Sequence, residues 1–138
     1  MMILINTNIF IKKRKTRVIG LGIDLCEVKR FERLQENEAF LQRVFSADEI
    51  AYCKKRTKSA QSFAARFAAK EAFGKALGIG ISGGVTLQEV EVRHNADNKP
   101  FLELSGKTKE IAEKFGVTKI HLSLTHETGV AAAVVILE

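Results

Sequence analysis

Four charged side chains lie in a segment that is otherwise apolar. The stretch RFAAKEAFGKALG, residues 66–78, consists mainly of Ala and Phe, yet it contains Arg66, Lys70, Glu71 and Lys75. On a helix, Arg66 and Lys70 share one edge, and Glu71 and Lys75 share another. Solvated i,i+4 pairs are the simpler explanation, but Arg66 and Lys70 repel each other unless an anion lies between them. We therefore expect a site for an anionic ligand, with Glu71 as a candidate metal ligand.

A second carboxylate, Asp24, lies at the end of the apolar run VIGLGID. A cap for the next helix is the simpler interpretation of an Asp at this place. Alternatively, Asp24 and Glu71 converge on one hard cation, since Mg²⁺ takes one or two protein carboxylates and fills its other positions with water and substrate phosphates. Lys and Arg side chains would then bind the remaining phosphate charge. This combination indicates phosphoryl-type transfer rather than acyl or hydride chemistry.

The hydrophobic pattern predicts the elements that must position these residues. A capping box, Ser46 with Glu49, begins one helix. The Ala-rich helix follows Ser59 and ends at Gly78, and its Ala side would admit a closely packed neighbour. Further helices are expected near 28–34, 38–43 and 106–116, a loop at 79–84, and strands at 17–25, 85–94, 101–104, 118–126 and 130–138. This order predicts an α+β fold with a mainly antiparallel sheet and helices packed on it.

Composition and charge restrict the class of protein. A chain of 138 residues, 46% hydrophobic and 28% charged, has the size and composition of one soluble globular domain. Its net charge of +6 predicts attraction to nucleic acid, phosphorylated small molecules or an acidic protein. Cys26 and Cys53 form no CxxC pair, which is typical of a protein of the reducing cytosol, so we expect a cytoplasmic location.

Residues 1–16 precede the predicted domain, which we place at residues 17–138. They are apolar and then basic, the reverse of a signal peptide, and their apolar part is too short to span a bilayer. The alternative is an anchor at a membrane surface, but a single short signal of this kind binds membranes weakly. We therefore expect an extension outside the domain and no association with a membrane.

Three segments together resemble the holo-acyl-carrier-protein synthases, a family of 4′-phosphopantetheinyl transferases. GIDLCEVKRFERL (residues 22–34) is similar to the first signature of that family, residues 66–78 to the second, and HLSLTHETGVAAAVVI (residues 121–136) to its C-terminal hairpin. The resemblance covers about Val18 to Glu138 and includes the turn at Lys99 and Pro100. Two motifs in order plus a matching C-terminus are a specific signal, whereas KEA alone would not be. The resemblance implies the family's fold, a homotrimer and a place in fatty acid biosynthesis.

The resemblance also implies a reaction. The phosphopantetheine arm of coenzyme A is transferred to a serine of apo-acyl carrier protein, and adenosine 3′,5′-bisphosphate is released. Asp24 and Glu71 fall on the family's magnesium ligands, and Lys75 would stabilise charge on the bridging oxygens. The serine proton would go through a metal-bound water to Glu71, with Asp24 as the alternative acceptor. We therefore expect Asp24, Glu71 and Lys75 to be catalytic, with Mg²⁺ as the cofactor.

Further residues match positions near coenzyme A in the family. Arg66 and Lys75 match contacts to its phosphates, and His126 matches a histidine near the coenzyme. Gly78 lies where the nucleotide end would lie, although a glycine after a helix is often only a C-cap. His121 is on the opposite face of its strand and is expected to be structural.

The first helix offers a basic surface for the acidic carrier. We predict that Arg30 and Arg33 bind the carrier protein, together with Lys29. Glu36 and Glu38 follow where relatives often have basic residues, so the extent of this surface is open.

Two rival classes are disfavoured. A nucleic-acid-binding domain would suit the 22 Lys and Arg, but the chain has one Tyr and no Trp, and its Phe residues lie at core spacings. A nucleotide hydrolase would require a P-loop, which the sequence lacks. A zinc site is disfavoured as well, because no third ligand is spaced to join His121 and His126.

Overall fold

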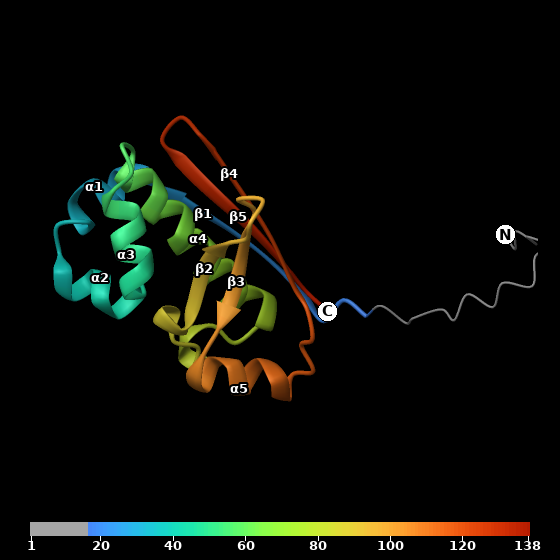
Figure 1. Ribbon diagram of the computed structural model, residues 1–138. Helices are drawn as coiled ribbons and strands as arrows, with labels where there is room; N and C mark the ends of the chain where they lie inside the picture. Colours follow the sequence, from blue (N-terminus) through green and yellow to red (C-terminus); the bar gives the residue numbers. More distant parts are fainter. Residues whose placement is uncertain (1–16) are drawn as a thin grey trace, which may run out of the picture.

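The computed structural model describes residues 17–138 and combines antiparallel sheets with helices (Figure 1). The predicted α+β class is confirmed. The expected N-terminal extension, residues 1–16, lies outside the described residues. Within the described part, no helix is both long and apolar enough to cross a membrane.

The elements are β1 (Gly20–Glu27), α1 (Val28–Leu34), α2 (Glu38–Val44), α3 (Ala47–Lys54), α4 (Ser59–Leu77), the 3₁₀ turns η1 (Ile81–Gly83) and η2 (Leu87–Glu89), β2 (Val90–His94), β3 (Pro100–Leu104), α5 (Gly106–Lys114), β4 (Ile120–Glu127) and β5 (Val130–Leu137).

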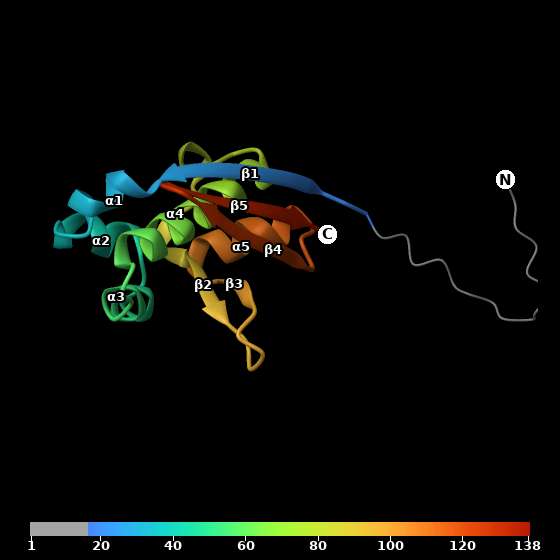
Figure 2. The same cartoon turned by 90° about the horizontal axis from the view of Figure 1, so that it is seen from above.

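The long helix α4 packs on one face of a three-stranded sheet (Figures 1 and 2). The strand order is β1–β5–β4, so β1 lies at an edge, and β2 and β3 form a separate hairpin. In the register, Asp24 is opposite Ala133, and Cys26 and His126 flank Ala131 from either side. Ala131 and Ala133 are buried, so the side chains of this row face α4.

Small residues on both partners let β1 approach α4 closely. A Cβ added to Gly22 would overlap the carbonyl oxygen of Ala72, and one added to Gly20 would overlap that of Ala76. The predicted role of the Ala side of this helix is therefore confirmed. Asp24 follows Gly22 by two residues on the same face, so the glycines bring its carboxylate alongside α4.

Several predicted boundaries differ from the structure. The strand expected at 85–94 begins only at Val90, because the chain first forms η2. Here the apolar alternation reflects burial of Val85 and Leu87 in the core, not a sheet ladder. The first strand begins at Gly20 rather than residue 17, and Ser59 is the first residue of α4 rather than its cap.

Two helix ends agree with the prediction. The Ser46 Oγ accepts a hydrogen bond from the Glu49 N–H at 3.1 Å, and the Ser46 N–H donates to Glu49 Oε1 at 3.0 Å, which completes the capping box. Gly78 ends α4 in the left-handed conformation, with φ of 79°, a region that favours glycine.

Candidate active site

Asp24 and Lys75 form the centre of the site. The Lys75 Nζ donates to Asp24 Oδ1 at 2.9 Å and to the carbonyl oxygen of Ile23 at 3.1 Å. The Lys75 side chain is 56% exposed, whereas that of Asp24 is 15% exposed. Asp24 does not cap the next helix, since the cap position of α1 is Glu27. The simpler interpretation of Asp24 is therefore wrong.

Glu71 is half-buried beside this pair. Burial raises the pKa of its carboxyl, and the charge of Asp24 raises this pKa further, against the opposing effects of Lys75 and Arg30. The charge of Asp24 thus lies close enough to disfavour the ionised form of Glu71. A divalent cation between them would relieve this repulsion.

The donor set suits magnesium better than zinc. Among residues 17–138, no group of three or more His, Cys, Asp or Glu side chains is arranged so that it could hold a metal ion. One or two carboxylates, here Asp24 on the edge strand β1 and Glu71 on α4, are what Mg²⁺ takes from a protein. Zinc sites use three or four protein ligands, with N and S donors common. Asp24 and Glu71 therefore fit the expected metal.

The cysteines offer no alternative nucleophile. Both are free and buried. Burial raises the pKa of the Cys26 thiol, which lies near Asp24, and raises that of Cys53 to about 12. Neither thiol is ionised near neutral pH, so neither is activated for attack.

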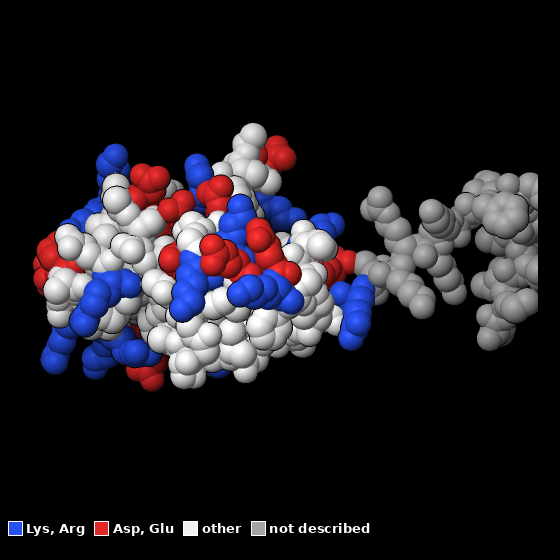
Figure 3. Space-filling view, turned by 90° about the horizontal axis from the view of Figure 1, so that it is seen from below, with Lys and Arg blue, Asp and Glu red and all other residues white. Residues whose placement is uncertain are grey.

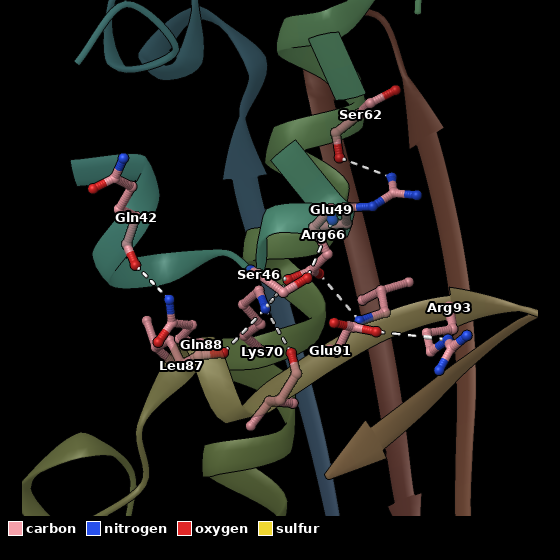
Figure 4. A network of polar contacts seen from close by, with 12 residues as sticks. Gln42, Ser46, Glu49, Ser62, Arg66, Lys70, Leu87, Gln88, Glu91 and Arg93 are labelled. Carbon is pink, nitrogen blue, oxygen red and sulfur yellow. Dashed lines mark hydrogen bonds and ion pairs between the residues drawn. The ribbon is translucent and has the colours of Figure 1, made fainter. Parts of the chain in front are cut away.

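The prediction that Lys70 faces an anionic ligand is wrong. Lys70 is fully buried, and its Nζ donates to Glu49 Oε1 at 2.7 Å and to the carbonyl oxygens of Leu87 and Val90 at 3.0 and 2.6 Å (Figure 4). Burial lowers the pKa of Lys70, against the opposing charge of Glu49. The anion required beside Lys70 is thus a carboxylate of the protein itself.

Arg66 keeps an unused donor. It is 4% exposed, and its Nη1 donates to the carbonyl oxygen of Ser62 at 3.3 Å. Its guanidinium lies 4.2 Å from the centroid of the Tyr52 ring, and His94 also stacks on that ring at 5.3 Å. Within the described chain, its buried Nε finds no hydrogen-bond partner. A hollow of about 250 Å³ is lined by Asp48, Glu49, Tyr52, Arg66, Glu91, Val92, Arg93, His94 and Asn98.

The other predicted coenzyme residues lie at different distances from Asp24. Gly78 lies one helical turn beyond Lys75. Its N–H donates to the carbonyl oxygens of Gly74 and Lys75 at the end of α4. His126 is exposed on β4, with its Nδ1 2.9 Å from Gln61 Nε2. Because β5 separates β4 from β1, these strands lie about 10 Å apart. One chain therefore brings Asp24, Glu71 and Lys75 together but leaves His126 away from them.

The predicted carrier surface is exposed on α1. The guanidinium of Arg30 lies 5.4 Å from the centroid of the Phe67 ring, and its charge acts on Glu71. Arg33 is exposed in the last turn of α1. Glu38, the acidic departure noted in the sequence, pairs with Lys54.

The charges on another face argue against a nucleic-acid platform. Figure 3 shows Lys and Arg interspersed with Asp and Glu on the side that carries α5. A continuous basic stripe, which such binding would require, is not formed on this face.

The sequence is similar to proteins of one family. Residues 20–135 match the family model described as ACPS, 4′-phosphopantetheinyl transferase superfamily. A holo-[acyl-carrier-protein] synthase of Syntrophus aciditrophicus is 50% identical over 123 residues, which cover 88% of this chain and 96% of the relative.

Solved structures gave the same result. A holo-[acyl-carrier-protein] synthase of Neisseria meningitidis has a TM-score of 0.81 at 32% identity, with 88% of this chain and 99% of the other covered. The Helicobacter pylori enzyme in complex with coenzyme A has a TM-score of 0.75 at 32% identity, with coverage of 86% and 99%.

Proposed function

Because the chain belongs to the 4′-phosphopantetheinyl transferase superfamily, we propose that Asp24, Glu71 and Lys75 carry out a magnesium-dependent phosphopantetheine transfer. The chain moves the 4′-phosphopantetheine arm of coenzyme A to a serine of apo-acyl carrier protein and releases adenosine 3′,5′-bisphosphate. The observation that supports the site best is the approach of two carboxylates, Asp24 and Glu71, with Lys75 bridging to the first of them.

Each residue has a role in the transfer. Asp24 and Glu71 would hold Mg²⁺, which when bound would supply positive charge to offset that of the coenzyme A phosphates. The serine oxygen attacks the phosphorus that bears the pantetheine, and the bond from this phosphorus to the bridging oxygen breaks. Lys75 is exposed and stabilises the charge on the leaving phosphate. Glu71 accepts the serine proton, with Asp24 as the alternative acceptor.

Arg66 binds a phosphate of the coenzyme in this proposal. Its buried Nε needs an acceptor, and a phosphate oxygen at the adjacent hollow would provide one. His126 and Gly78 contact the same ligand. Since His126 lies away from Asp24 within one chain, a coenzyme bound between subunits would contact one set of residues from each.

The outer face of the sheet supports a homotrimer. Leu21, Ile23 and Leu25 on β1 are 63%, 59% and 67% exposed, and they adjoin Val134 and Ile136 of β5. Such a contiguous apolar face is typical of a protein interface. The Ala-rich helix contributes nothing to it, because its Ala side is buried against β1 and β5.

The remaining assignments follow from the same reaction. Arg30 and Arg33 bind the acidic carrier protein. The domain spans residues 17–138, and residues 1–16 lie outside it. The two free cysteines suit a reducing cytoplasm, where the enzyme would supply carrier protein for fatty acid biosynthesis.

Mass spectrometry tests the proposed function. Apo-acyl carrier protein is incubated with the chain and coenzyme A, with Mg²⁺ in one sample and excess chelator in the other. We expect a gain of one phosphopantetheine per carrier only with Mg²⁺. No gain with Mg²⁺ would overturn the transfer, and an equal gain with chelator would overturn the metal dependence alone.

A further inference from the structure

The ion pair between Glu49 and Lys70 connects three elements at one buried point (Figure 4). Glu49 on α3 binds Lys70 on α4 through Oε1 and accepts the Val92 N–H of β2 through Oε2, at 3.1 Å. Lys70 also donates to the carbonyl oxygens of Leu87 and Val90, on η2 and β2. The two side chains are 1% and 0% exposed. The pair therefore fixes α3, α4 and the η2–β2 segment relative to one another.

A second cluster lies on the same three elements. Each of its members is one helical turn, or two strand residues, away from a residue of the ion-pair network. Tyr52 is one helical turn after Glu49 on α3, and Arg66 is one turn before Lys70 on α4. His94 is two residues beyond the β2 residue that Glu49 binds, on the same face of the strand. Arg66 and His94 both lie on the Tyr52 ring. The position of this cluster thus depends on how the ion pair holds its three elements.

The cluster needs such support because Arg56 places a second positive charge beside it. The guanidinium of Arg56 lies 5.4 Å from the centroid of the Tyr52 ring, so Arg56 and Arg66 share one aromatic ring. The two positive charges repel each other, which favours moving Arg66 away from the Tyr52 ring that it shares with Arg56. An ion pair out of water contributes little net stability compared with apolar side chains of similar volume, but it demands a defined geometry. The ion pair therefore fixes the positions of the elements that it joins, which an apolar contact would not do.

We propose that Glu49 and Lys70 are positioning residues, which hold the Tyr52–Arg66–His94 cluster so that Arg66 is preorganised for a coenzyme phosphate. The role of Arg66 in this inference rests on the proposed function, whereas the positioning of the cluster does not depend on it. It predicts that loss of the pair weakens coenzyme binding and leaves the Asp24 site intact.

Steady-state kinetics provide the first test. In Glu49→Leu/Lys70→Met, the KM for coenzyme A should rise about 10-fold, because a charge-assisted contact is no longer preorganised. The KM for the carrier and kcat at saturating coenzyme should stay near wild type. Leu41→Ala, a fully buried site on α2, is the matched control for lost stability and should leave both KM values unchanged. If Arg66→Gln raises the KM for coenzyme A but the folded double variant leaves it unchanged, the proposal is overturned.

Tyr52 provides a readout that does not depend on activity. The chain has one Tyr and no Trp, so its intrinsic fluorescence reports Tyr52 alone. Loss of the pair should uncover the ring and raise acrylamide quenching toward that of the urea-unfolded protein, whereas Leu41→Ala should not. If Arg66→Gln leaves the KM for coenzyme A unchanged, the binding role of Arg66 fails, and quenching still decides the positioning.

A conservative variant covers the case in which the double variant does not fold. Glu49→Gln keeps the shape of the side chain but removes the charge that faces Lys70. We expect a rise in quenching and in the KM for coenzyme A, because the buried charge of Lys70 loses the carboxylate that neutralises it. Wild-type values of both would contradict the inference.

Discussion

Lys75 binds Asp24 across the gap between α4 and β1, with its Nζ 2.9 Å from Oδ1, instead of pairing with Glu71 one turn earlier on its own helix. This ion pair raises the pKa of Lys75, chiefly through the hydrogen bond to Asp24, so the ammonium stays charged at neutral pH. Lys75, which is proposed to stabilise charge on the phosphate, and Asp24, which is proposed to hold the metal, are thus in contact before a ligand binds.

The first prediction concerns Lys75. Lys75→Gln should lower kcat by ~10²-fold or more if the ammonium is a preorganised charge at the developing anion. The melting temperature should change little, because an ion pair this exposed contributes little to stability. Lys109→Gln, which removes an exposed charge from α5, is the control and should leave both quantities unchanged. A Lys75→Gln variant with wild-type kcat would exclude the proposed role.

The second prediction concerns the contact between β1 and α4. Gly22→Ala should lower the free energy of unfolding by more than ~3 kcal/mol, because the added Cβ overlaps backbone of Ala72 that cannot move aside. Gly116→Ala should cost only about 1 kcal/mol, since its positive φ is strained but the space around it is open. Urea denaturation measures both. Equal losses in the two variants would show that the close approach is unimportant.

The proximity of Asp24 and Glu71 could be predicted from the sequence for a physical reason. Asp24 and Glu71 interrupt segments that are otherwise apolar, and a charge in such a segment needs a partner or a ligand. The same argument was wrong for Lys70, because its partner Glu49 lies 21 positions away and was recognisable only as part of a capping box. A sequence pattern shows that a charge needs compensation, but not which distant element provides it.

Other features of the structure could not be predicted from a sequence pattern. Tyr52 and His94 are isolated residues on α3 and β2, and only the tertiary fold brings them to Arg66. The 3₁₀ turn η2 was predicted as strand, because alternating apolar residues bury equally well in either conformation. The strands β1, β4 and β5 were predicted well, since each carries a continuous or alternating apolar pattern over eight residues.

The third prediction concerns the carrier surface. Arg33→Glu should raise the KM for the carrier roughly 10-fold at low salt and much less at high salt, while the KM for coenzyme A stays constant. Arg33 is a cleaner test than Arg30, because Arg30 also acts on Glu71. The control is Lys109→Glu on α5, with the same change of charge. If both variants raise the KM for the carrier equally, net charge rather than docking on α1 is responsible.

The fourth prediction concerns assembly. Light scattering should give about three times the chain mass of 15.3 kDa for the wild type. Leu21→Lys places a charge in the exposed face of β1 and should produce a smaller species with reduced activity. Phe115→Lys, at an exposed apolar residue after α5, should remain assembled. A fully active wild-type monomer at micromolar concentration would refute the homotrimer.

The central claim is that Asp24 and Glu71 together hold the magnesium ion required for transfer. It is tested most directly by the rate of carrier modification, followed by mass spectrometry across a range of Mg²⁺ concentrations. The wild type and Glu27→Gln, which changes an exposed carboxylate on the same strand, should show the same saturating dependence on Mg²⁺. Asp24→Asn and Glu71→Gln should fold but show almost no transfer at limiting Mg²⁺. Wild-type rates in both variants at limiting Mg²⁺ would contradict the two-carboxylate site.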